Sequence, residues 1–178
     1  ELKVPYPASS PALLANFLRI KPGERLRTCP NATSELYHVI RGKGRSRLGP
    51  GGDGGELPWK QGDFFTLPAR CPAEHHADED SAFYWVHDEP LMRYLGATAD
   101  TPRFKPTLYL REQAEKELAE VAKAPKARQR SRVSVLLANT KFEQTQTVTH
   151  VLWAMFGVLP ADTVQLPHRH ESVALDFV

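Results

Sequence analysis

Short strand-like runs separated by turns dominate the first half of the chain. Between about residues 12 and 96, segments that are rich in aromatic and β-branched residues, or that alternate between polar and apolar positions, are divided by turns of glycine, proline and aspartate. A run beginning at Leu13 follows spaced prolines and is the first expected strand. Such regular spacing is typical of a sandwich or closed barrel. The other strand candidates are Glu35–Arg41, Arg45–Leu48, Phe64–Leu67 and Ala82–His87.

The pattern becomes helical after this β-rich half. Between Leu110 and Ala124, glutamate, lysine, alanine and leucine recur at helical spacing, and Pro125 ends the run, which predicts a helix. The basic segment 126–132 comes next. It lacks the aromatic residues or the motif that a nucleic-acid site needs, and we interpret it as a linker between domains.

A second β-rich region follows this linker. The apolar runs Val133–Ala138 and Val148–Val158 are predicted strands, and a polar segment then leads to His168-Arg169-His170. With 178 residues, the chain is long enough for one well-cored domain and part of another. The expected divisions are a first barrel at 1–98, a helical connection with a basic linker at 99–132, and the opening strands of a second barrel at 133–178.

Charge and cysteine usage narrow the class of protein. The 23 Lys and Arg residues against 21 Asp and Glu give a formal net charge of +2, which offers no reason to expect nucleic-acid or membrane-surface binding. Cys29 and Cys71 fit no metal-finger or disulfide framework. No apolar run approaches the roughly 20 residues of a membrane span, and no signal-peptide pattern opens the sequence. We expect a soluble, cytoplasmic protein whose partners are small molecules or further copies of itself.

Glycines and one acid stand at fixed intervals in the first half. Gly23 is followed at regular distances by Glu35 and Gly42, and five residues separate Gly62 from Pro68. These intervals resemble the two motifs of the cupin superfamily. In cupins, a His-x-His pair on one strand directs both imidazoles into a barrel, and a later strand supplies a third histidine. The resemblance implies an all-β fold of the jelly-roll type.

The metal-binding positions of these motifs carry other residues here. The His-x-His positions fall on Cys29 and Asn31, and the third position falls on Ala73, with His75 and His76 two and three residues later. The first half therefore resembles a cupin that has lost its metal centre. An unusual centre built from these cysteine, asparagine and histidine side chains with Glu35 is the less favoured alternative, because no combination keeps the usual geometry.

A closer resemblance is to the gentisate 1,2-dioxygenases. The segments Ser34–Gly44, Gly62–Pro68 and Asp88–Met92 look like the C-terminal cupin of that family. The segments Leu152–Pro160 and Pro167–Leu175 look like its N-terminal, metal-bearing cupin. Either the two halves stand in reversed order or each is one paralogous cupin unit. We therefore expect a two-cupin protein.

The family resemblance assigns chemistry to the second region. It implies that His168 and His170 bind Fe(II) with a third histidine, which leaves coordination positions for O2 and for a small hydroxylated aromatic acid. No further catalytic residue is identified. No histidine follows His170, so the third ligand and the closing strands are expected from a longer chain or another copy. Asp176 stands where the family usually has an arginine, which argues against gentisate itself as substrate.

Other functions and simpler interpretations stay open. The degenerate first half favours a non-catalytic cupin that binds a small ligand or serves assembly, and isomerisation or decarboxylation with another divalent metal suits the same fold. Open strand edges predict a homodimer or larger assembly. His38 and His87 are interpreted as hydrogen-bonded core or surface histidines. The aromatic residues interpreted as barrel core are Trp59, Tyr84, Trp85, Trp153 and Phe156.

Overall fold

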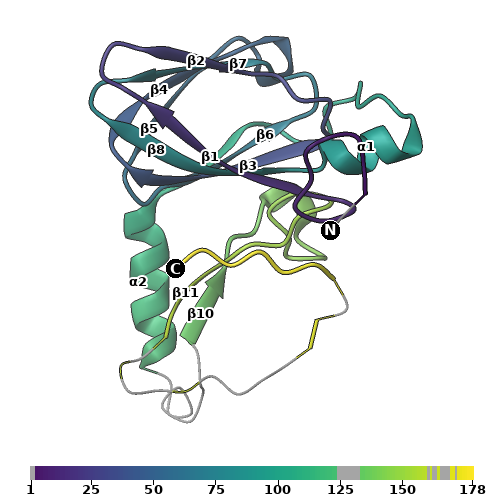
Figure 1. Ribbon diagram of the computed structural model, residues 1–178. Coiled ribbons are helices and arrows are strands. Elements are labelled where there is room, and N and C mark those ends of the chain that lie inside the picture. The colour runs from purple at the N-terminus through teal and green to yellow at the C-terminus, as the bar shows by residue number, and fades with distance from the viewer. Residues whose placement is uncertain (1–2, 124–132, 160, 162–163, 165–168, 171) are drawn as a thin grey trace.

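Two antiparallel sheets face one another in the first part of the chain (Figure 1). The computed structural model describes residues 3–123, 133–159, 161, 164, 169–170 and 172–178. One sheet has five strands in the order β1-β8-β3-β6-β9, and the other has four in the order β2-β7-β4-β5. In the first sheet the bounds are β1 Leu14–Ile20, β8 Ser81–His87, β3 Ser34–Arg41, β6 Phe64–Pro68 and β9 Thr107–Tyr109. In the second they are β2 Arg25–Thr28, β7 Ala73–Ala77, β4 Lys43–Leu48 and β5 Glu56–Lys60, with the short 3-10 helix η1 at Pro50–Gly52.

The strand predictions for the first half of the chain are confirmed. All four candidates are strands, with ends that shift by no more than two residues, and the expected first strand is β1. Strands β2, β5 and β7 were not predicted. They are short and carry charged residues, and they form because each pairs with a neighbour, as when Arg27 of β2 lies opposite Glu74 of β7.

The inner side chains of both sheets fill the space between them. Tyr37, Phe65 and Phe83 of the five-stranded sheet are fully buried and meet Trp59 and His75 of the four-stranded sheet. Tyr37 stacks on Phe65 with ring centroids 4.5 Å apart, and Phe83 meets Trp59 edge to face at 4.7 Å. Aromatic pairs in these arrangements gain energy beyond that of area burial. The inside of the sandwich is therefore a close-packed core.

The glycines of the cupin spacing lie in left-handed turns. Gly42 has φ 88° between β3 and β4, and Gly62 has φ 89° between β5 and β6. A Cβ on Gly42 would collide with Ser81, and one on Gly62 with Arg111, so only glycine fits both the conformation and the space. Arg70 stands at the motif's next glycine position and keeps a left-handed φ of 57°. The turn geometry thus persists where the metal ligands do not.

Two α-helices flank the sandwich. Helix α1, Glu89–Leu95, follows β8 and was not predicted. Helix α2, Arg111–Ala122, confirms the helix predicted from Leu110 to Ala124. Its start is fixed by Asp63, whose Oδ1 accepts a hydrogen bond from the Arg111 backbone N–H at 2.9 Å. Within the part of the chain that the structure describes, no helix is long and apolar enough to cross a membrane.

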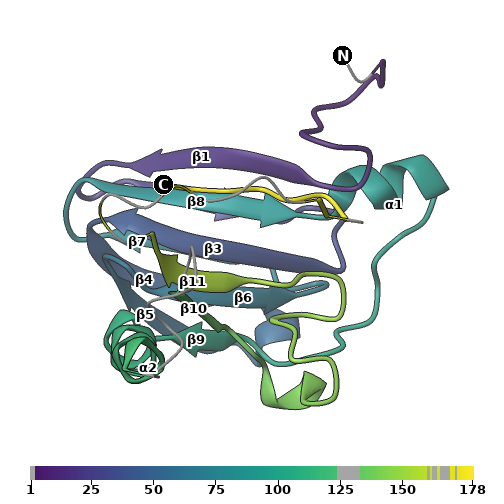
Figure 2. The ribbon, with the colours of Figure 1, turned by 90° about the horizontal axis from the view of Figure 1, so that it is seen from below.

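The region after residue 132 packs on the outer face of the five-stranded sheet (Figure 2). Strands β10 Val133–Leu136 and β11 Met155–Val158 pair as a two-stranded antiparallel sheet, with a 3-10 helix, η3, at Thr140–Phe142 between them. Val148 and Leu152 are buried in one apolar cluster with Val86 of β8 and Ala114 of α2. This cluster attaches the second region to the sandwich.

Two expectations for this region are wrong. The predicted strand Val148–Val158 exists only in its last four residues, because Thr149 closes a turn in which its Oγ1 accepts a hydrogen bond from the Leu152 N–H at 3.0 Å. Trp153 was interpreted as barrel core but is 63% exposed. In contrast, Trp59 is buried, and Tyr84, Trp85 and Phe156 are partly buried beside the two apolar clusters.

Candidate functional site

The degenerate metal positions of the first half do not converge on one point. Cys29 is exposed. The Asn31 amide is used in the loop, where Nδ2 donates to the Ala97 carbonyl and Oδ1 accepts from the Ala99 N–H, both at 2.9 Å. Ala73 is buried and offers no donor atom. Asn31 therefore serves loop structure and Ala73 serves packing, in place of the cupin histidines.

Glu35, the acid of the motif, is buried and hydrogen-bonded inside the sandwich. Its Oε2 accepts a hydrogen bond from the Tyr37 hydroxyl at 2.6 Å and one from the Trp85 indole N–H at 3.0 Å. Burial is the main cause that raises the pKa of this carboxyl group from 4.5 to about 8, although the two hydrogen bonds oppose that shift. Glu35 is therefore a protonated, neutral acid at pH 7.

His75 lies across the interior on β7, fully buried. Its Nε2 is 3.0 Å from the Thr28 hydroxyl and its Nδ1 is 2.7 Å from the Ser46 hydroxyl. Burial lowers the pKa of the imidazole to about 3, so the ring is neutral. A neutral imidazole has one donor and one acceptor nitrogen, and both are already used.

These groups form one continuous chain of hydrogen bonds, which we call the interior chain. It runs from the Trp59 indole through Ser46, His75, Thr28 and Tyr37 to Glu35, where the Trp85 indole closes it. Its links join the four-stranded sheet to the five-stranded sheet. Sequence reasoning identified Glu35 but missed the hydroxyl members; the available signal was that Tyr37 lies two residues from Glu35 and shares its inward face.

Donor and acceptor counting gives one consistent direction for each link. With the Tyr37 hydroxyl donating to Glu35 Oε2, the Thr28 hydroxyl donates to Tyr37 and accepts from His75 Nε2–H. Nδ1 of the neutral ring then accepts from Ser46, which accepts in turn from Trp59. Each hydroxyl donates once and accepts once. The hydroxyl, imidazole and indole groups of the interior chain are thereby satisfied.

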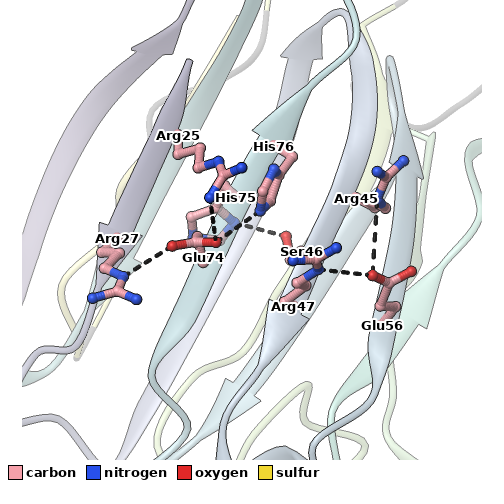
Figure 3. A network of polar contacts seen from close by, with 9 residues as sticks. All are labelled: Arg25, Arg27, Arg45, Ser46, Arg47, Glu56, Glu74, His75 and His76. Atoms are coloured by element: carbon pink, nitrogen blue, oxygen red, sulfur yellow. Dashed lines mark hydrogen bonds and ion pairs between the residues drawn. The ribbon is translucent and has the colours of Figure 1, made fainter. Parts of the chain in front are cut away.

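The same strand points its alternate side chains to the outside. His75 faces inward to Ser46, while its neighbours Glu74 and His76 lie on the outer face of the sheet, where His76 Nε2 is 2.9 Å from Glu74 Oε1 (Figure 3). His75 and His76 therefore cannot share a ligand. In the ranges that the structure describes, no group of three His, Cys, Asp or Glu side chains is arranged to hold a metal ion. The interior of the sandwich does not fit a metal cofactor.

The two histidines interpreted as structural lie apart from this interior chain. His87 is buried, and its Nδ1 accepts a hydrogen bond from the Glu89 N–H at 3.3 Å, as expected of a hydrogen-bonded core histidine. His38 stacks on Phe64 with ring centroids 4.2 Å apart, and within the described residues its buried Nδ1 has no hydrogen-bond partner. Burial is the main reason why the pKa values of the His38 and His87 imidazoles are lowered. The hydrogen-bonding prediction is confirmed for His87.

The predicted metal pair falls at the edge of what the structure describes. His168 lies outside the described residues, and His170 is exposed. The segment 172–178 lies along the outer face of the five-stranded sheet, where the Phe177 ring stacks on Tyr84 with centroids 5.5 Å apart (Figure 2). The pairing of His168 with His170 at a metal therefore stays a prediction.

Comparison with known proteins gives a partial match. No family model matches the chain, and no curated protein matches it. Among solved structures, salicylate 1,2-dioxygenase from Pseudoaminobacter salicylatoxidans, in its adduct with gentisate, aligns with 57% of this chain at 21% identity and a TM-score of 0.46, and the alignment spans 25% of the dioxygenase chain. A conserved protein of unknown function from Streptococcus pyogenes aligns with 44% of this chain and 66% of its own at 16% identity and a TM-score of 0.39. The two facing antiparallel sheets, with left-handed glycines at the motif spacing, match the cupin-like β fold that the sequence predicts.

Proposed function

We propose that this chain is part of a two-cupin, ring-cleaving dioxygenase of the gentisate type, in which the first sandwich is structural and the metal chemistry belongs to residues 133–178. The observation that carries the proposal is the interior chain, which fills the first sandwich with groups that satisfy one another. The His-x-His pair of the second region is the remaining sequence pattern that suits a redox-active metal. The three-part division at 98 and 132, the homo-oligomer and the cytoplasmic location belong to the same proposal.

His168 and His170 would hold Fe(II) together with a third protein ligand. The bound metal supplies open coordination positions for O2 and for adjacent oxygens of a hydroxylated aromatic acid. Neutral imidazoles suit this role because they bind the metal without cancelling its charge. The substrate class rests on the family resemblance of the segment that contains these two histidines.

Asp176 narrows the substrate class. It stands six residues after His170, where the family usually has an arginine. An arginine pairs with the carboxylate of an aromatic acid, whereas an aspartate repels it. We therefore expect gentisate to be a poor substrate, and the Asp176→Arg variant to bind gentisate more tightly than the unchanged chain does. Equal affinities, measured by calorimetry on the iron-loaded protein, would remove this residue from the proposal.

The test is iron content by elemental analysis, measured beside oxygen uptake with salicylate, gentisate and a hydroxynaphthoate. We expect near-stoichiometric iron after anaerobic loading of the wild type, and loss of most of it in His168→Ala and His170→Ala. His76→Ala, on the outer face, is the matched histidine control and should keep its iron. Iron that persists in the double variant His168→Ala/His170→Ala, or that never binds the wild type, would sink the proposal.

A non-catalytic cupin is the second candidate, and the filled interior of the sandwich favours it. Its expected signature differs from that of the dioxygenase: a small aromatic acid would bind, and no oxygen would be consumed in the presence of Fe(II). Oxygen uptake above the level of the His168→Ala variant would decide against this candidate.

A further inference from the structure

The outer face of the four-stranded sheet is a flat, charged surface. Because side chains alternate along a strand, every second residue of β2, β7, β4 and β5 points away from the core. We call this surface the basic face. It consists of Arg25, Arg27, Lys43, Arg45, Arg47, Glu56, Pro58, Lys60, Glu74 and His76. No segment in the described ranges covers it, since α2 and the second region lie elsewhere on the molecule (Figures 1 and 2).

The strand register sets the four arginines of this face in two rows across the sheet, and Lys43 lies opposite Lys60 in a third. In one row His76 lies between Arg25 and Arg45. In the next row Glu74 lies between Arg27 and Arg47, and Glu56 follows Arg47. Residues opposite one another in such ladders have Cβ atoms about 5 Å apart, so the guanidinium groups of one row can act on the same ligand.

Each carboxylate on the basic face is shared by two arginines (Figure 3). Glu74 Oε2 lies 3.0 Å from Arg27 Nε, and Glu74 Oε1 lies 3.9 Å from Arg25 Nη1. Glu56 Oε1 lies 3.0 Å from Arg47 Nε and 3.8 Å from Arg45 Nε. The longer separations exceed hydrogen-bond length, so Arg25 and Arg45 are held only loosely. A guanidinium has five N–H donors, and these two arginines therefore have donors to offer to another molecule.

The basic face carries more positive than negative charge. Lys60 is paired with Glu112 of α2. The four arginines and Lys43 against Glu56 and Glu74 leave five minus two, an excess of three positive charges, whereas the whole chain has a formal net charge of +2. The sequence has a second basic region in the segment 126–132, with Lys126, Arg128, Arg130 and Arg132. An anionic partner is attracted to the basic face by its excess of positive charge.

We propose that the basic face binds an acidic segment of a partner protein, whose Asp and Glu carboxylates lie between neighbouring arginines as Glu56 and Glu74 already do. The four cations that carry the site are arginines, whose planar groups match carboxylate geometry better than lysine does. The face carries no Phe, Tyr or Trp side chain. It therefore lacks the stacking platform on which single-stranded nucleic acid is bound.

The test uses the full chain and fluorescently labelled poly-L-glutamate, with binding followed by fluorescence anisotropy. We expect saturable binding that weakens steeply as salt is raised. Arg25→Gln/Arg45→Gln should lose about fivefold or more in affinity, since two charge contacts are removed. Far-ultraviolet circular dichroism of each variant confirms that it is folded.

A matched control comes from the opposite sheet. Arg19 and Arg41 also share one carboxylate, that of Asp80, and their side chains are 61% and 49% exposed, against 64% and 47% for Arg25 and Arg45. Arg19→Gln/Arg41→Gln removes the same net charge and should change the affinity less than about twofold.

Three results would overturn the proposal. The first is absence of poly-L-glutamate binding at low salt, or equal losses in the two double variants. The second is tighter binding of an oligo-dT of matched charge than of poly-L-glutamate, which would make the occupant a nucleic acid. The third is sedimentation of the wild type alone as an assembly that Arg25→Gln/Arg45→Gln dissociates, which would make the occupant a second copy of the chain.

Discussion

The two outer faces of the sandwich differ far more than its two inner faces do. The outer face of the five-stranded sheet presents Leu36, Phe64 and Tyr84, and the second region covers it. The outer face of the four-stranded sheet presents arginines, and none of the segments that the structure describes covers it. Both sheets alternate in the same way, so the identity of every second residue decides whether a sheet becomes an internal layer or a surface.

The largest expected effect comes from the covered face. Leu152→Ala leaves a cavity in the cluster with Val86 and Ala114, and should lower the free energy of unfolding by about 2–4 kcal/mol. Arg27→Ala on the bare face should change it by less than about 0.5 kcal/mol. Urea denaturation of both variants checks the contrast. Similar losses in the two would show that the covered and bare faces do not differ in their contribution to stability.

The second largest expected effect is a pH dependence of stability that comes from the interior chain, where the two sheets meet. The pKa of Glu35 is raised from 4.5 to about 8 in the folded state, so its contribution to stability is complete below pH 4.5 and is lost as the pH rises through 8. The pKa of His75 is lowered from 6.5 to about 3, so its contribution is lost only as the pH falls below 6.5. Between pH 6.5 and 8, Glu35 is therefore the member of the interior chain that makes stability depend on pH.

We expect the contribution of Glu35 to the free energy of unfolding to fall by roughly 1.5 kcal/mol over this interval as the pH rises. Glu35→Gln keeps the carbonyl acceptor for Tyr37 and Trp85 but cannot ionise, so it should flatten the slope. Glu56→Gln on the basic face is the matched control and should keep the slope. Denaturant midpoints at both ends of the interval measure it, and a slope that survives in Glu35→Gln would refute the assignment.

The smallest effect concerns the turn that leads into β7. Arg70 holds a left-handed φ of 57° at a glycine position of the motif. Arg70→Gly relieves the strain of this conformation, although glycine adds entropy to the unfolded chain, and the net gain should be about 0.5–1 kcal/mol. Differential scanning calorimetry would register a higher melting temperature. A lower melting temperature would mean that the Arg70 side chain stabilises the fold by more than the left-handed backbone conformation destabilises it.

How much of this fold the sequence predicts depends on how each strand is stabilised. β3, β6 and β8 carry enough aromatic and β-branched residues to be identified alone. β7, with the sequence Ala-Glu-His-His-Ala, has no such preference and is a strand because β2 and β4 pair with both of its edges. Local pattern does not contain that information.

The candidate site divides in the same way. The motif spacing identified Glu35 and the loss of ligands at Cys29 and Asn31, because these are properties of single positions. The interior chain could not be predicted, since His75 meets Thr28 and Ser46 only through the register of three strands. A shift of one residue would have turned His75 outward and His76 inward.

The interior chain also couples the fluorescence of a tryptophan to the ionisation of Glu35. The sequence has three tryptophans, and the structure sets each in a different environment. Trp85 donates to the carboxyl group that titrates near pH 8, Trp59 donates to a hydroxyl at the far end of the interior chain, and Trp153 is exposed to solvent. A water-soluble quencher therefore suppresses the fluorescence of Trp153 first. The remaining emission comes from Trp85, whose partner Glu35 changes its charge, and from Trp59, whose partner Ser46 stays neutral. A pH-dependent change in this emission therefore reports the ionisation of Glu35 without an external dye.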